Sequence, residues 1–475
     1  MIDPFILLGV GILIVVGGII LLKLHPFFAL ILGALAVALL SGPENLRLFA
    51  QSRAMDPSAT AEIMGQSTGV RIARAFGNTV GRVGILIAMA SIIADCLFKS
   101  GGADKIIRRL IKWFGLRNAP LAFLSGSFTL GMPVFFDTVF YLTFPLARTL
   151  AARTKKNYGL YLMSIIAGGV MAHSLVPPTP GPLYVATELG VNIGVMILAG
   201  IVIGSITAFT GYLYARWTDR RHPLPIRDSE SSSLGELESR TRLADEELPS
   251  FWRAIAPILV PVLLISGNTI LKLVLEDRSA ASHLLLRTFA FAGDSNIALT
   301  ISAIIALLML ARSKLTDVSM KKSIQNSISQ AGVIILITGA GGAFGRVLEQ
   351  TGITIRIADF FHLGNLAILP VAFLITALIR TAQGSATVAM ITAIGIVGGF
   401  AAGGNLPFHP VYLALAIGCG SKIFPWMNDS AFWIISRISG MNEKETIRNF
   451  SFLLTIMGVV GLISIIGFAL VLPLV

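Results

Sequence analysis

The chain has 475 residues, of which 55% are hydrophobic and only 13% are charged, and its mean hydropathy is +0.80. A soluble globular protein carries about a quarter of charged residues, because water must solvate its surface. This composition therefore excludes a soluble protein and indicates a surface that faces lipid. The formal net charge of +12 does not indicate a nucleic-acid partner, because the basic residues stand at the ends of apolar segments, where topology signals occur.

About ten apolar segments predict membrane-spanning helices, some of them broken, because about 20 apolar residues cross a bilayer. They are residues 5–22, 26–41, 83–98, 158–176, 191–215, 253–275, 294–311, 331–348, 410–436 and 451–474. The first has no basic segment before it and no small-residue cleavage site after it, so we expect it to be retained as a helix. The two cysteines lie inside apolar runs and predict no disulfide framework.

Two further apolar stretches, 119–151 and 365–400, are interrupted in the middle by polar residues, glycine or proline. The first contains SGSFTLGMPVFFD at 125–137, and the second contains RTAQGSATVAM at 380–390. Non-helical backbone at membrane depth must be surrounded by protein or by a water-filled cavity. We therefore predict two re-entrant hairpins that enter and leave on the same side of the membrane.

The distribution of lysine and arginine predicts the orientation of the chain. With periplasmic N- and C-termini, most basic residues fall in the cytoplasmic loops, as the positive-inside rule requires in an inner membrane. The one long polar stretch, 216–252, is then a cytoplasmic linker rich in serine, glutamate and arginine. It separates a first membrane repeat (1–215) from a second (253–475), each with an odd number of crossings. Two such repeats in tandem have opposite orientations in the membrane.

Weak internal similarity supports the repeat. LFKSGG at 97–102 corresponds to VLEQTG at 347–352, the two interrupted stretches align, and HSLVPPTPGP at 173–182 corresponds to SKIFPWMNDS at 421–430. Interrupted hydrophobic segments at corresponding positions of two halves are the best sequence indication of a transporter binding site. We therefore expect the binding site at these breaks, near the middle of the membrane.

Ionisable side chains inside apolar spans are costly, at about 2.5–3.5 kcal/mol even on lenient insertion scales, so each needs a partner or a function. Six candidates are Asp95, Asp137, His173, Arg380, Lys422 and Asp429. An apolar setting favours the protonated form of a carboxylate, which makes Asp137 a candidate proton carrier, unless it pairs with a nearby cation. Asp429 either carries a proton, holds polar groups of the substrate, or caps the broken helix. Asp95 lies near a span end and can simply face water.

The cations and the histidine have alternatives of their own. Arg380 can hold a carboxylate with two parallel hydrogen bonds, or it can form an internal salt bridge with Asp137 or Asp429. Lys422 is a second anchor or a counter-ion. His173 titrates near neutral pH when unperturbed and can relay protons, but a lone histidine is more often a hydrogen-bonded core residue.

The predicted site combines these groups with donors at the helix breaks, because the N-terminus of a half-helix favours anions. The predicted proton-coupling residues are Asp137, His173 and Asp429. The predicted substrate contacts are Gly131, Pro133, Thr179, Arg380, Gln383, Gly384, Ser385, Thr387, Lys422, Asn428 and Ser430. The sequence contains no hydrolase, metalloprotease or ATP-binding motif. We therefore expect a transporter rather than an enzyme, without metal or cofactor.

Four motifs, GMPVFFD at 131–137, HSLVPPTPGP at 173–182, RTAQGSATVAM at 380–390 and NDSAFW at 428–433, resemble the gluconate permease family of proton symporters. The resemblance covers nearly the whole chain. It implies a scaffold part and a moving transport part, an elevator-like motion and a homodimer. The chain departs from the family pattern at Thr179, where histidine is usual, and at residues 425–427, where Ser-His-Val is usual. These departures bear on the particular substrate.

The sequence thus predicts an all-α polytopic membrane protein with two inverted repeats that imports a small hydroxycarboxylate, such as gluconate or a related sugar acid, together with protons. The alternatives are a sodium-coupled carrier of di- or tricarboxylates, and a D-serine or glycerate permease with the same fold. A passive channel is a further alternative, distinguished by uptake that never exceeds the outside concentration.

Overall fold

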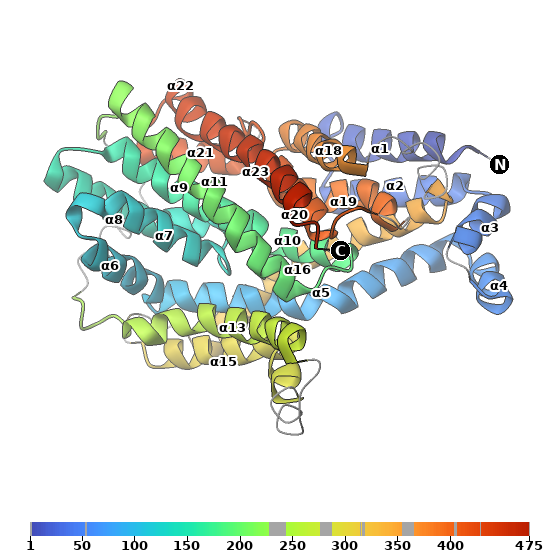
Figure 1. Cartoon of the computed structure of the whole chain (residues 1–475), viewed down its shortest axis with the longest axis horizontal. Coiled ribbons are helices and arrows are strands. Elements are labelled where there is room, and N and C mark those ends of the chain that lie inside the picture. The colour runs from blue at the N-terminus through green and yellow to red at the C-terminus, as the bar shows by residue number, and fades with distance from the viewer. Residues whose placement is uncertain are drawn as a thin grey trace.

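The computed structural model describes residues 2–52, 55–227, 244–275, 287–313, 315, 319–353, 365–402, 406–427 and 429–474, and every regular element in these residues is helical (Figure 1). Up to residue 221 the helices are α1 (Pro4–Ile20), α2 (Pro26–Leu40), α3 (Pro43–Ser52), α4 (Pro57–Gly65), α5 (Thr68–Lys99), α6 (Gly102–Phe114), α7 (Ala119–Gly131), α8 (Phe136–Thr154), α9 (Tyr158–Leu175), α10 (Pro180–Glu188) and α11 (Ile193–Arg221). From residue 251 they are α13 (Phe251–Leu275), α15 (Ser295–Ala311), α16 (Met320–Glu349), α18 (Ile368–Gln383), α19 (Ala386–Ala402), α20 (Val411–Gly420), α21 (Ser430–Ser439), α22 (Glu443–Thr446), the π-helical turn Ile447–Ser451 and α23 (Phe452–Val471). The all-helical fold class is confirmed.

Local sequence sets the helix starts. Proline occupies the first turn of α1, α2, α4 and α10, where its missing N–H and fixed φ angle fit a helix start. At other helix starts a side chain accepts a hydrogen bond from a free backbone N–H of the first turn. Ser67 accepts from Val70 N–H at α5, and Asn192 accepts from Gly194 N–H at α11. By length and composition, six described stretches can cross a membrane: Thr68–Lys99, Tyr158–Glu188, Ile193–Arg221, Phe251–Leu271, Met320–Glu349 and Glu443–Val471. Shorter apolar helices accompany them, so the number of crossings stays a prediction.

Three expected spans differ in extent from the helices observed. α5 begins at residue 68 rather than 83, and α16 begins at 320 rather than 331. Both helices have a polar first part that extends beyond the apolar window. The expected span 410–436 is divided into α20 (Val411–Gly420) and α21 (Ser430–Ser439), and the described residues between them, 421–427 and 429, are not helical. The two expected hairpins are each a pair of helices with a short break, at 132–135 between α7 and α8 and at 384–385 between α18 and α19.

The long helices α5 and α16 pack against each other and run in opposite directions (Figure 1). Near the start of α5, Arg71 Nη1 donates to Gln350 Oε1, just after the end of α16, at 3.2 Å. At the other end, Ser323 in the first turn of α16 donates to Asp95 near the end of α5. The two helices are therefore antiparallel, as corresponding helices of two repeats with opposite orientations in the membrane must be.

The order of elements recurs in the second part of the chain. The broken pair α7–α8 is followed by α9, a break, α10 and the long α11, and the broken pair α18–α19 is followed by α20, a break, α21 and α22–α23. The packing recurs as well, since α2 lies against α16 and α15 against α5. The boundaries at 1–215, 216–252 and 253–475 stay predictions, and residues 228–243 of the linker lie outside the described residues.

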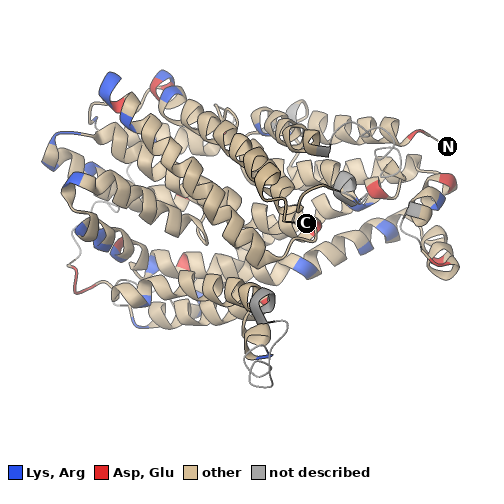
Figure 2. Cartoon of the chain, viewed as in Figure 1, with Lys and Arg blue, Asp and Glu red and all other residues tan. Residues whose placement is uncertain are grey.

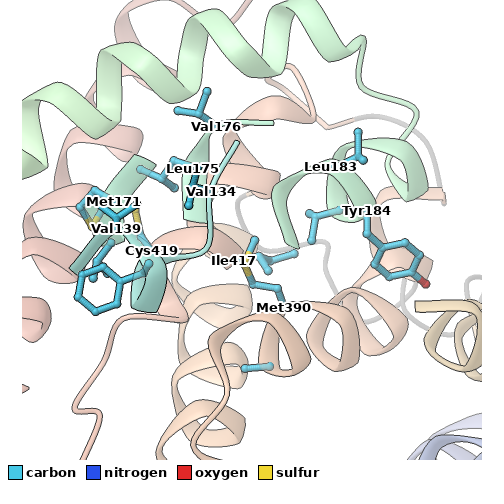
Figure 3. Close-up of a cluster of buried hydrophobic side chains, with 14 of the residues drawn as sticks. Val134, Val139, Met171, Leu175, Val176, Leu183, Tyr184, Met390, Ile417 and Cys419 are labelled. Carbon is cyan, nitrogen blue, oxygen red and sulfur yellow. The ribbon is translucent and has the colours of Figure 1, made fainter. Parts of the chain in front are cut away.

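The core lies around α9 and the short helices near it. Figure 3 shows its side chains from five helices and the segments between them, namely Val134, Val139, Met171, Leu175, Val176, Leu183, Tyr184, Met390, Ile417 and Cys419, all buried. By contrast, lysine and arginine gather at the end of the molecule formed by α6, the α8–α9 turn and the end of α11 (Figure 2). Such a gathering is typical of a cytoplasmic side, while the orientation of the termini stays a prediction.

Candidate functional site

A cavity of about 260 Å³ lies where three helix breaks meet. Residues 135–137 enter it from the α7–α8 break, residues 384–388 from the α18–α19 break, and Lys422 and 429–431 from the α20–α21 break. Val170 and His173 of α9 also line it. The sequence prediction of a site at repeat-related breaks thus corresponds to a real concavity.

The structure brings together nine of the predicted site residues: Asp137, His173, Arg380, Gly384, Ser385, Thr387, Lys422, Asp429 and Ser430 line the cavity. Three others do not line it. A Cβ at Gly131 would lie 2.6 Å from the carbonyl oxygen of Gly169, so this glycine lets α7 and α9 approach closely. Pro133 is buried, and the Thr179 hydroxyl donates to the Val176 carbonyl at 2.8 Å. Asn428 and the side chain of Gln383 lie outside the described residues.

Arg380 and Asp429 form a buried ion pair, with 4% and 6% of their side chains exposed. Arg380 Nη2 donates to Asp429 Oδ2, and Arg380 Nε donates to the Ser421 carbonyl at 3.0 Å. The other oxygen of Asp429 accepts from Ala431 N–H at 2.9 Å and caps α21. Of the alternatives left open by the sequence, the internal salt bridge and the helix cap are both present. The two bonds of Arg380 hold Ser421 and Asp429 against α18.

Lys422 and Asp137 have no such partner. The Lys422 residue is 3% exposed and lines the cavity, and its ammonium group makes no hydrogen bond or ion pair with any described residue. The carboxylate of Asp137, in the first turn of α8, is likewise unpaired within the described chain. The cavity therefore contains one paired and one unpaired group of each sign.

His173 belongs to α9 and lies beside the break between α7 and α8. Its ring lies against Phe135, with ring centroids 5.5 Å apart, and it hydrogen-bonds the backbone of Val134. Its Nδ1 is buried and has no partner among the residues that the structure describes. The imidazole thus has one nitrogen available for a proton or a ligand group.

The helix starts add a favourable field for anions. α8, α19 and α21 all begin at the cavity wall, and helix N-termini carry partial positive charge. Asp429 caps α21, and Ser385 Oγ accepts from Val388 N–H at 3.4 Å in α19. Phe135 precedes α8 without a side-chain cap.

Sequence reasoning did not find the apolar wall of the cavity. It is formed by Phe135, Phe136, Val170, Ile334, Ile337, Val388, Ile391, Phe450 and Leu454, with Ala386 and Ala431. Ile334 and Ile337 belong to α16, far from any break in the sequence. Their three-residue spacing puts them on one helix face, but an apolar pair in a membrane helix gives no sign of lining a site. Asp95 lies elsewhere, where it pairs with Lys99 at 2.7 Å.

Known proteins resemble this chain over nearly all its length. A family model described as GntP family permease matches residues 4–471. An uncharacterized permease of Haemophilus influenzae is 31% identical over 475 residues, covering 98% of this chain and 91% of that protein. The high-affinity gluconate transporter of Escherichia coli K12 is 30% identical, covering 97% of this chain and 98% of that protein.

A solved structure shares the fold. The YdaH transporter of Alcanivorax borkumensis superposes with a TM-score of 0.60 and 15% identity, covering 88% of this chain and 90% of that one. At this identity the likeness shows the fold alone. The apolar helices make the protein a multi-pass membrane protein, and the match of residues 4–471 shows that the chain belongs to the GntP permease family.

Proposed function

We propose that the protein is a secondary active transporter of the inner membrane that imports a small hydroxycarboxylate, gluconate or a related sugar acid, together with protons. One observation carries the proposal, namely the charges of the cavity at the helix breaks. Lys422 and Asp137 form no ion pair with any described residue, whereas Arg380 and Asp429 form an ion pair with each other. The substrate class is supported by the relative named as a gluconate transporter.

The charges of the cavity explain how proton and anion would be coupled. With Asp137 ionised and His173 neutral, the four charged side chains sum to zero. When Asp137 takes a proton the cavity gains one positive charge, on Lys422, and a carboxylate restores neutrality. Burying an uncompensated charge costs several kcal/mol. A proton and a monoanion entering together keep the cavity neutral both empty and loaded, whereas either one alone does not.

A neutral cavity is also what alternating access would need. The helices with breaks, α7–α10 and α18–α21, carry the polar groups, and α16 contributes the apolar residues Ile334 and Ile337. An elevator-like motion of the first group along the α5–α16 pair would expose the site to each side in turn. Periplasmic termini, a cytoplasmic 216–252 linker and a homodimer complete the proposal, supported by the basic end of the molecule and the family resemblance.

Uptake of radiolabelled gluconate into proteoliposomes tests the proposal. With an inward proton gradient, the label should accumulate above the outside concentration, and an uncoupler should abolish accumulation. Accumulation that follows a sodium gradient instead would favour the sodium-coupled carboxylate carrier. Uptake that never exceeds the outside concentration would favour a channel. A folded protein that takes up D-serine or glycerate but not gluconate would redirect the substrate within the same fold.

Asp137→Asn tests the proton carrier. The amide keeps the shape of the protonated acid, so the variant should still exchange labelled for unlabelled gluconate but lose proton-driven accumulation. Asp95→Asn is the matched control, because Asp95 lies outside the cavity and its hydrogen-bond donors, Ser323 and Lys99, can also reach an amide oxygen. Wild-type accumulation by Asp137→Asn would contradict the role of Asp137.

A further inference from the structure

We propose that the central cavity selects monocarboxylates over dicarboxylates, and that Asp429 enforces this selection by neutralising Arg380 and leaving Lys422 as the one unpaired cation among the described cavity residues. The inference rests on the proposed function, because it concerns the same cavity. It goes further by naming the charge of the substrate and the residue that sets it.

Arg380 offers no unbalanced positive charge to a ligand in this arrangement. Its Nε and Nη2 already donate, to the Ser421 carbonyl and to Asp429. Its Nη1 is buried, with no partner in the described part of the chain. The guanidinium therefore positions Ser421 and Asp429, and its positive charge is balanced by the adjacent carboxylate before any substrate arrives.

Lys422 differs from Arg380 in that its ammonium group forms no salt bridge with any described carboxylate. It follows Ser421 in the same non-helical segment and lines the cavity, and no carboxylate of the described residues lies within salt-bridge distance of its ammonium group. A buried ammonium without a counter-ion is unfavourable, so a carboxylate that binds beside Lys422 supplies the missing charge. One unpaired cation can neutralise one carboxylate.

A second carboxylate on the substrate would find no matching charge. The charged side chains lining the described cavity are Asp137, Arg380, Lys422 and Asp429. With Asp137 protonated, a monoanion leaves the loaded cavity neutral, and a dianion leaves it with one negative charge. The rest of the wall is largely apolar, with the rings of Phe135, Phe136 and Phe450 and the aliphatic chains of α16 and α19. Ser385, Thr387 and Ser430 add polar groups but no further cationic side chain, so nothing among the described lining residues balances the extra charge.

Asp429→Asn separates the charge of this residue from its structural role. Asparagine is as good a helix N-cap as aspartate, so the bond to Ala431 N–H can persist. The variant removes the counter-charge of Arg380 and gives the protonated cavity two unpaired positive charges. A bound dianion then leaves the cavity neutral, as a bound monoanion does in the native protein.

The experiment compares gluconate with glucarate, the six-carbon acid of the same chain length that has a carboxylate at each end. Both acids, unlabelled, compete for uptake of labelled gluconate into liposomes that contain the full-length protein. In the wild-type protein gluconate should compete at the lower concentration. In Asp429→Asn the ratio of the two half-inhibitory concentrations should shift toward glucarate by about tenfold or more, which corresponds to about 1.4 kcal/mol.

Two variants serve as controls. Asp294 caps α15 in the same way, accepting from Asn296 N–H at 3.0 Å and Ile297 N–H at 3.2 Å, and it lies outside the central cavity. Asp294→Asn should leave the ratio unchanged. The double variant Arg380→Gln with Asp429→Asn removes both members of the ion pair and restores the charge balance, so the preference for gluconate should return.

The outcomes distinguish the inference from the proposed function. An unchanged ratio in an active Asp429→Asn protein overturns the inference. If this variant does not transport, the shift in thermal unfolding temperature produced by each acid measures the same preference, and a folded variant stabilised by neither acid also overturns it. A wild-type protein that neither transports gluconate nor is stabilised by it overturns the proposed substrate instead. The ratio is then measured with glycerate and its three-carbon diacid, tartronate.

Discussion

Gly168 is the position where α7 and α9 come into backbone contact, and Gly168→Ala should disturb the site through this contact. An added Cβ would lie 2.1 Å from the Leu124 carbonyl oxygen and 2.9 Å from the Phe128 nitrogen, whereas real Cβ atoms essentially never approach within 3.0 Å. The obstacles are backbone atoms, which cannot rotate away, so the helices must separate by most of an ångström. Overpacking of this kind costs about 1–3 kcal/mol. The gain from replacing a helical glycine by alanine, about 1 kcal/mol, offsets part of that cost.

Because the obstacles are backbone atoms, we expect the upper end of the overpacking cost, which leaves a net destabilisation of about 2 kcal/mol, visible as a lower thermal unfolding temperature in detergent. A thiol-reactive dye can follow unfolding, because both cysteines are buried. Transport should fall as well, since α7 leads to the break before Asp137 and α9 carries His173. Gly77→Ala is the matched control: Gly77 is exposed on α5 and an added Cβ meets nothing within 4 Å, so its unfolding temperature should be unchanged or higher. A wild-type unfolding temperature for Gly168→Ala would refute the close contact.

Three further predictions concern regions away from the cavity. Arg71→Met should destabilise the protein by about 1–3 kcal/mol, because the buried Gln350 oxygen loses its donor; an unchanged unfolding temperature would contradict this. Cys96 and Cys419 are 0% exposed, so mass spectrometry should find neither modified by a maleimide until the protein unfolds. Asp245→Asn removes ion pairs to two lysines of α6 at 3.1 Å but should cost less than about 1 kcal/mol, and the effect should disappear in high salt. A larger, salt-independent loss would indicate another role.

The fold could be predicted largely because membrane helices are marked by their apolar windows. This signal located the cores of α5 and α16 but not their starts, since residues 68–82 and 320–330 are helical and relatively polar. Each of these starts is bonded to the end of the other helix, by the bond from Arg71 to Gln350 and by the bond from Ser323 to Asp95. Hydropathy reports what contacts lipid, and such extensions contact protein or water.

The charged residues of the site could also be predicted, because an ionisable group in an apolar span is rare enough to stand out. The pairing among them could not. The sequence left both Asp137 and Asp429 open as salt-bridge partners of Arg380, and the choice depends on how Ser421 and Asp429 are placed against α18. The apolar wall is invisible to sequence reasoning for the opposite reason: Ile334 and Ile337 resemble every other apolar pair in a membrane helix.

The two carboxylates of the cavity differ in their surroundings, because Asp429 is paired with Arg380 and Asp137 forms no ion pair with any described residue. Asp137→Asn and Asp429→Asn each remove one potential negative charge, yet they should have different consequences. Without the Asp137 carboxylate the cavity holds a fixed single positive charge, so it can bind a monoanion with no proton and cannot use a proton gradient. Without the Asp429 carboxylate the proton carrier remains, and the cavity alternates between one and two positive charges as Asp137 gains a proton. Acceptance of a dianion by the second variant but not by the first is therefore expected if Asp429 stays ionised beside Arg380, as the observed ion pair indicates.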